Sequence, residues 1–391
     1  MVNRLPQTQP SHLLLGIILV AATLRPSITT VGPLIPMIRA DLGLSNGLAG
    51  FLTTLPLITF ATFSLFSASI GRRMGYARAI LLGMIIIAIG ILVRVTGGPF
   101  LLFLGTGLTG IGIVICNVLL IPLVKVRMPE KVGKITGIYA TVMTLVAAIG
   151  SAVSVPLAVD FSLGWRGSLV AWIVLLVVAI VIWLPQVKPQ KTVNPIQSNS
   201  PIVNVWKSKL AWQVSLFMGV QSLLFFTLIT WLPDLFISRG VTPVNAGLII
   251  SLMQLVALIG TFLAPIIAVR SREQSQMILV LGGCYLVGYG LLFSPAIVWN
   301  IAGISLAGLC MGASLSMAYT LITLRTANDR TTAALSGMAQ STGYYLAALG
   351  PVLFGMAMDQ WQNWDHLIYL VLITSLFFGG FGYFAGKNKK V

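Results

Sequence analysis

Among the side chains of this sequence, Arg25 gives the most information about function, because of where it lies. It lies about halfway along the apolar run of residues 13–37, and no Asp or Glu lies near the middle of any hydrophobic segment. Placing a guanidinium inside a bilayer costs roughly 2.5 to 17 kcal/mol, depending on how the cost is measured. Its planar fork stays charged and can hold two oxygens. A cation with no internal counter-charge is therefore suited to bind an anion, or a polarised group, that arrives from outside.

Neutral polar side chains at a similar depth in other apolar segments are the next candidates for the same site. These candidates are Thr54, Asn117, Tyr139, Gln221, Gln254, Gln340 and Tyr344. Any one of them could instead join two helices by a hydrogen bond, worth about 0.6 kcal/mol on average. Trp231 and Tyr344 are available as an aromatic wall. We expect these residues to bind the substrate together with Arg25.

Prolines interrupt the apolar segments that carry these candidates. Pro26 follows Arg25 directly, and Pro56 lies in the middle of the second segment. Each removes a backbone donor and frees a carbonyl one turn earlier. Freed carbonyls at membrane depth need protein or water as partners, so we expect Arg25, Pro26 and Pro56 to face a cavity. Simple kinks are the alternative. Arg94, near the end of the third segment, is expected to extend to the membrane interface, with a second anion contact as its alternative.

The elements that must position these residues are long apolar helices. Hydrophobic residues make up 57% of the 391 residues and charged residues 8%, whereas soluble domains carry about 25% charge. Runs of this length cross a hydrocarbon core of about 30 Å. The predicted spans are 12–36, 48–70, 79–96, 99–124, 135–158, 168–184, 210–236, 245–269, 277–294, 297–324, 334–357 and 365–386. The pattern predicts an all-α integral membrane protein with twelve transmembrane helices.

The net charge of +16 follows the predicted topology. Nineteen of the 24 Lys and Arg residues fall on the side of the spans that carries both termini, and only Arg39, Arg166 and Arg239 fall on the other. By the positive-inside rule, both termini are expected in the cytoplasm. The charge is therefore explained by topology, and no nucleic-acid partner is expected.

An internal repeat and one polar stretch divide the chain. An offset of 200 residues aligns Gly112 with Gly312 and Lys125 with Arg325, and it also aligns residues 147–150 with 347–350. The segment 186–209 is rich in Pro, Asn, Ser and Lys, which is typical of a linker. We predict an N-terminal six-helix bundle (1–185), a cytoplasmic linker (186–209) and a C-terminal six-helix bundle (210–391). Two such halves place a substrate site near mid-membrane between them.

Several stretches resemble the major facilitator superfamily and, within it, the cyanate and nitroimidazole transporter family. They are residues 23–25, 52–57, 112–122, 210–213, 230–233 and 334–341. The resemblance implies the two-bundle fold and a secondary active or facilitative transporter in a prokaryotic inner membrane. It also implies a small anion or small polar organic compound, cyanate-like or nitroimidazole-like, as substrate.

One loop departs from the superfamily pattern. The resemblance implies a Gly-x-x-x-Asp-Arg-x-Gly-Arg type loop between the second and third spans. We expect Gly71, Arg73 and Gly75 of this loop to take part in gating, together with Pro26 and Pro56. Residues 70–78 carry Arg72 where Asp is expected. The charge relay implied by the family pattern is therefore in doubt.

Other functions have less support in the sequence. His12 and His366 lie at span ends, and the three cysteines are far apart, so neither enzyme activity nor a metal or cofactor is expected. Export of toxic small molecules or drugs is the alternative within transporters, and a non-transporting membrane sensor is less favoured. We expect a monomer in the lipid bilayer. Substrate identity, direction and coupling (uniport, symport or antiport) stay open.

Overall fold

The computed structural model describes residues 10–187, 204–327 and 329–391, and these ranges contain α-helices, short 3-10 turns and no β-strand. The N-terminal helices are α1 (Pro10–Leu24), α2 (Pro26–Thr29), α3 (Val31–Leu42), α4 (Asn46–Met74), α5 (Tyr76–Val93), α6 (Pro99–Arg127), α7 (Val132–Val159), α8 (Gly164–Val170) and α9 (Trp172–Trp183). The C-terminal helices are α10 (Lys209–Ser238), α11 (Pro243–Arg270), α12 (Ser275–Gly290), α13 (Ile297–Leu324), α14 (Asp329–Trp361) and α15 (Asp365–Ala385).

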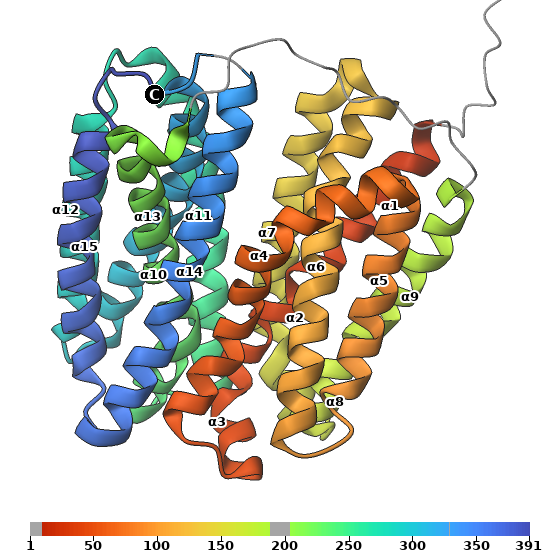
Figure 1. Cartoon of the computed structure of the whole chain (residues 1–391). Helices are drawn as coiled ribbons and strands as arrows, with labels where there is room; N and C mark the ends of the chain where they lie inside the picture. Colours follow the sequence, from red (N-terminus) through yellow and green to blue (C-terminus); the bar gives the residue numbers. More distant parts are fainter. Residues whose placement is uncertain (1–9, 188–203, 328) are drawn as a thin grey trace, which may run out of the picture.

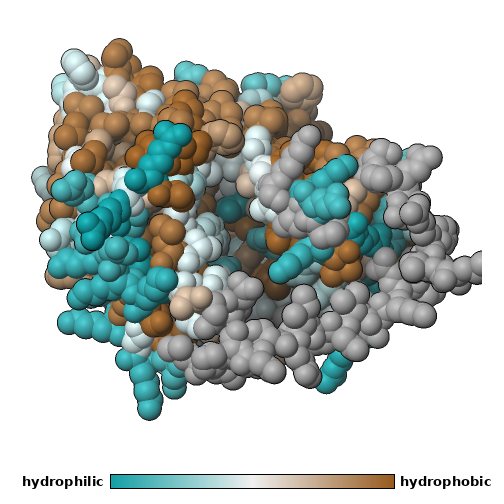
Figure 2. Space-filling view, turned by 90° about the horizontal axis from the view of Figure 1, so that it is seen from above, coloured by the Kyte–Doolittle hydropathy of each residue, from teal (hydrophilic) through white to brown (hydrophobic). Residues whose placement is uncertain are grey.

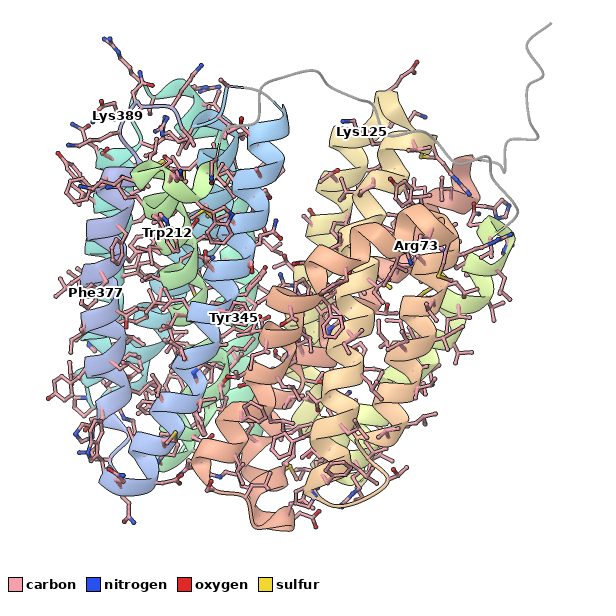
Figure 3. The ribbon with its side chains drawn as sticks, in the orientation of Figure 1. Arg73, Lys125, Trp212, Tyr345, Phe377 and Lys389 are labelled. Carbon is pink, nitrogen blue, oxygen red and sulfur yellow. The ribbon has the colours of Figure 1, made fainter. Side chains whose placement is uncertain are left out.

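The helices form two bundles that stand side by side, α1–α9 in one and α10–α15 in the other (Figure 1). We call the face on which α1 begins and α15 ends the terminal face; Lys125 and Lys389 lie toward it in the two bundles (Figure 3). Most of the predicted linker 186–209 lies outside the described residues, and α10 begins at Lys209.

Eleven helical segments of the described ranges are long and apolar enough to cross a membrane. The twelfth predicted span corresponds to α14, which is 33 residues long but falls outside that set. Polar side chains such as Ser336, Gln340 and Tyr344 lie along it. The all-α membrane fold predicted from the sequence is thus confirmed.

The first predicted span is not one continuous helix. The structure divides residues 12–36 among α1, α2 and α3, with breaks at Arg25 and Thr30. Pro26 and Pro33 lack the N–H groups that would bond to the carbonyls of Ala22 and Thr29. The missing donors explain why the helix is interrupted at these points, the first of them beside Arg25.

Closely packed glycines join neighbouring helices within each bundle. A Cβ atom on Gly112 of α6 would collide with the Gly83 carbonyl of α5, and one on Gly312 of α13 would collide with the Ala257 carbonyl of α11. The small side chains let the backbones touch.

The two bundles also touch each other, on the side opposite to the terminal face. A Cβ atom on Gly50 of α4 would collide with the Pro351 carbonyl of α14, and one on Gly355 would collide with the Asn46 carbonyl. Asp359 of α14 accepts hydrogen bonds from the backbone N–H groups of Asn46 (2.9 Å) and Gly47 (3.0 Å). The halves are therefore closed on this face.

The predicted loop at 70–78 is mostly helical. Helix α4 continues to Met74 and α5 begins at Tyr76, so the connection is Gly75 alone, whose φ of 85° suits glycine. Gly71 is buried within α4, and Arg73 is exposed. The side chain of Arg72 lies outside the part of the structure that is described.

Candidate substrate-binding site

An open cavity lies between the two bundles, with a volume of about 650 Å³ when the solvent space at its mouth is included. Its lining is Arg25, Thr144, Ala147, Gln221, Ser222, Phe225, Phe226, Gln254, Ala257, Thr261, Met311, Gly312, Leu315 and Tyr344. These residues come from the α1–α2 junction, α7, α10, α11, α13 and α14. Seen from the terminal face, the surface is hollowed between the two halves (Figure 2).

Arg25 is the only charged residue of this lining. It lies at the break between α1 and α2, where its carbonyl accepts the backbone N–H groups of Ile28 and Thr29, both at 3.0 Å. Within the described ranges, its guanidinium makes no hydrogen bond and no ion pair, since all three ion pairs there lie elsewhere. The cavity is therefore positively charged without an internal counter-ion.

Helix α10 contributes both polar and aromatic groups. Gln221 donates through Nε2 to Ser222 Oγ at 2.6 Å, and both residues line the cavity. Phe225 and Phe226 lie one turn further along the same helix. Neither ring is among the residues predicted from the sequence, although a spacing of four residues from Gln221 and Ser222 places both on the same helix face.

Helix α11 contributes one stripe of side chains. Gln254, Ala257 and Thr261 are spaced by three and four residues, so they share a helix face. Tyr344 of α14 is also part of the lining, and its ring packs against Phe60 of α4 with centroids 5.4 Å apart. Arg25, Gln221, Gln254 and Tyr344 are thus brought together as neighbours in space.

Five of the predicted site residues lie outside this lining, and four of them bond to neighbouring helix residues. Tyr139 donates to Asn117 Oδ1 at 2.7 Å and joins α7 to α6. Gln340 donates to Ser336 Oγ one turn earlier on α14. Thr54 donates to the Ala348 carbonyl at 2.8 Å and so links α4 to α14, across the two halves.

Trp231 is not part of an aromatic wall of the cavity. Its side chain is fully buried, and its Nε1 donates to the Pro351 carbonyl at 2.9 Å. Its ring packs against Phe354 and Trp364. The buried indole N–H needs an acceptor, and the contact with α14 supplies one away from the cavity.

The expectations for the prolines and for Arg94 need correction. Pro26 packs against α7 near Gly150, and Pro56 packs against α6 near Gly110, so neither lines the cavity. Arg94 does not extend to the interface: its side chain is fully buried, and Nη1 donates to the Ser27 carbonyl at 2.9 Å. The interrupted first span leaves the Ser27 carbonyl available to Arg94. The position of Arg94 near the end of the third span does not predict this contact.

Two pseudo-repeated helical bundles around a central polar cavity define a multi-pass membrane transporter. The sequence matches the model of the Major Facilitator Superfamily over residues 17–351, and the chain belongs to this family. Solved structures agree in fold. A bacterial homolog of the human lysosomal transporter Spinster, in an inward-facing conformation, superposes with a TM-score of 0.77 at 16% identity, covering 97% of this chain and 98% of that one.

Three curated relatives match most of the chain. The uncharacterized transporter YycB of Bacillus subtilis is 43% identical, with 98% of this chain and 95% of the relative covered. The 2-nitroimidazole transporter of Escherichia coli is 39% identical, with 97% and 96% covered. The cyanate transport protein CynX of Escherichia coli is 25% identical, with 88% and 89% covered. These relatives are transporters rather than enzymes, as the sequence predicted.

Proposed function

We propose that this protein carries a small anion, or a small polarised organic compound, across the membrane by alternating access, with Arg25 as the charged contact. The observation that supports this most is the unpaired guanidinium of Arg25 in the cavity between the halves. Gln221, Gln254 and Tyr344 supply hydrogen bonds, and Phe225 and Phe226 supply an apolar wall. The relatives named for 2-nitroimidazole and cyanate agree with a compound of this kind.

We also propose a monomer in a prokaryotic inner membrane with both termini in the cytoplasm. Nineteen of 24 basic residues favour this orientation. The terminal face is then cytoplasmic. Because the halves touch on the opposite face, the conformation described is open to the inside.

Counterflow in proteoliposomes tests the carrier directly. Vesicles preloaded with unlabelled compound should take up labelled 2-nitroimidazole or labelled cyanate faster than protein-free vesicles. Counterflow measures exchange in either direction, so it tests the carrier whether it imports or exports. Repeating the assay with a pH gradient separates proton-coupled from uncoupled transport. The absence of counterflow for both compounds would overturn the proposal.

A further inference from the structure

Gln254 is a buried amide whose two ends have different surroundings. The residue is 2% exposed and lines the cavity. Its Nε2 donates to Ser151 Oγ of α7 at 2.8 Å, across the two halves. Its Oε1 has no hydrogen-bond partner among the described residues. A buried carbonyl oxygen without a donor is unfavourable, so this oxygen indicates where a ligand group belongs.

The chain itself determines which amide atom faces Ser151. Pro33 has no N–H, so the Thr29 carbonyl lacks its helical donor, and Ser151 Oγ donates to that carbonyl at 3.3 Å. With its proton used in this way, Ser151 Oγ accepts from Gln254. Nε2 also donates to the Ile250 carbonyl at 3.5 Å, a position that would repel Oε1. These two contacts fix the orientation of the Gln254 amide and leave its Oε1 without a hydrogen-bond donor.

We propose that the cavity selects ligands that carry an N–H or O–H donor for Gln254 Oε1, in addition to an anionic or acceptor group for Arg25. This inference rests on the proposed function and narrows its substrate class. Arg25 offers only donors and Gln254 an acceptor, and the two residues come from opposite halves. Phe225, Phe226 and Met311 border the space with apolar surface. Flat N–H heterocycles and hydroxylated aromatic acids meet all three requirements, whereas the cyanate ion has no donor.

Calorimetric titration of the purified full chain with two matched pairs of compounds tests the inference. One pair is 2-nitroimidazole and 1-methyl-2-nitroimidazole; the other is 4-hydroxybenzoate and 4-methoxybenzoate. The donor-bearing member should bind roughly tenfold more tightly, the effect of leaving one buried acceptor unpaired. Gln254→Met removes the acceptor, so the two members of each pair should bind with about equal affinity. A preference caused only by the size of the added methyl group would survive this change.

Two serine variants separate the orientation of the amide from general effects on α7. Ser151→Ala releases the Gln254 amide to rotate and should weaken the preference. Ser154→Ala should keep it, because Ser154 Oγ donates to the Ser151 carbonyl at 3.0 Å, while the Gln254 amide bonds to Ser151 Oγ and the Ile250 carbonyl. Loss of the preference in Ser154→Ala would therefore count against the inference.

The outcomes distinguish this inference from the proposed function. Equal binding of both members of a bound pair by the wild-type protein would overturn the donor requirement and leave the carrier proposal intact. A preference retained in Gln254→Met and in Ser151→Ala would also overturn it. If none of the four compounds binds the wild type but labelled cyanate shows counterflow, the donor requirement fails and the carrier proposal stands. If counterflow is also absent for both 2-nitroimidazole and cyanate, the proposed function and this inference both fail.

Discussion

Replacing Asp359 with Ala should shift the protein away from the conformation in which the halves touch opposite the terminal face. The Asp359 carboxylate accepts three hydrogen bonds from the start of α4, two from backbone N–H groups and one from Asn46 Nδ2 at 2.8 Å. Asp359 belongs to the C-terminal half and α4 to the N-terminal half. Ser45 still caps α4 by accepting from Leu48 N–H at 3.2 Å, so the helix itself should persist.

The expected change in the free-energy difference between the two conformations depends on how exposed Asp359 is. Hydrogen bonds to a charged group contribute about 1.5 to 3 kcal/mol each when buried, but an exposed anion at a helix N-terminus contributes about 0.3 to 1 kcal/mol. Because Asp359 is exposed, we take about 1 to 2 kcal/mol for the three bonds together. The ratio of the two conformations should then change by about 5- to 30-fold.

Electron–electron distance measurements between two spin labels report the populations of the two conformations. Labels at Asp160 and Gln360, on a background with the three cysteines replaced by alanine, report the separation of the halves on the face opposite to the termini; both positions are exposed. Asp359→Ala should increase the population of long distances.

Asp365→Ala is the matched control. Asp365 binds Arg239 at 2.7 Å, and both residues belong to the C-terminal half, so the distances should stay as in the wild type. An unchanged distribution in Asp359→Ala, or an equal change in the control, would refute the reasoning.

Two further substitutions test the contacts around this closed face. Gly50→Val should also lengthen the label distances, because its side chain would collide with the Pro351 carbonyl. Gly137→Val is the control and should leave the distances unchanged, because a Cβ there meets no atom within 4 Å. Equal distances in the two variants would contradict this prediction. Trp231→Phe loses the hydrogen bond to Pro351 and should lower stability by about 1 kcal/mol in thermal unfolding. The ligand affinity of this variant should be unchanged. A large loss of affinity would indicate that Trp231 contacts the ligand after all.

The sequence predicted the membrane fold well because apolar length and charge distribution reflect the bilayer directly. Arg25, Gln221, Gln254 and Tyr344 were predicted as one group, and the cavity contains all four. Depth in the membrane can be read from position along a span, and polar residues at mid-depth need a partner or a cavity.

The remaining assignments failed where rotation about the helix axis decides the outcome. Trp231 and Gln221 lie on the same helix, yet one packs against α14 and the other lines the cavity. Weak amphipathicity in a membrane helix gives little information on which face is inward. The sequence placed Arg94 at the interface because it does not show the second break in the first span, at Thr30, beside which the Ser27 carbonyl accepts from Arg94.

The most direct test of the account is the affinity of Arg25→Gln for 2-nitroimidazole, measured by titration calorimetry beside Arg166→Gln. Arg166 pairs with Asp41 at 2.7 Å outside the cavity, so its variant controls for the loss of one positive charge. We predict that Arg25→Gln binds at least about 30-fold more weakly, as expected for a lost buried charge contact of about 2 kcal/mol or more. Its melting temperature should be unchanged. Wild-type affinity in Arg25→Gln would contradict the central claim.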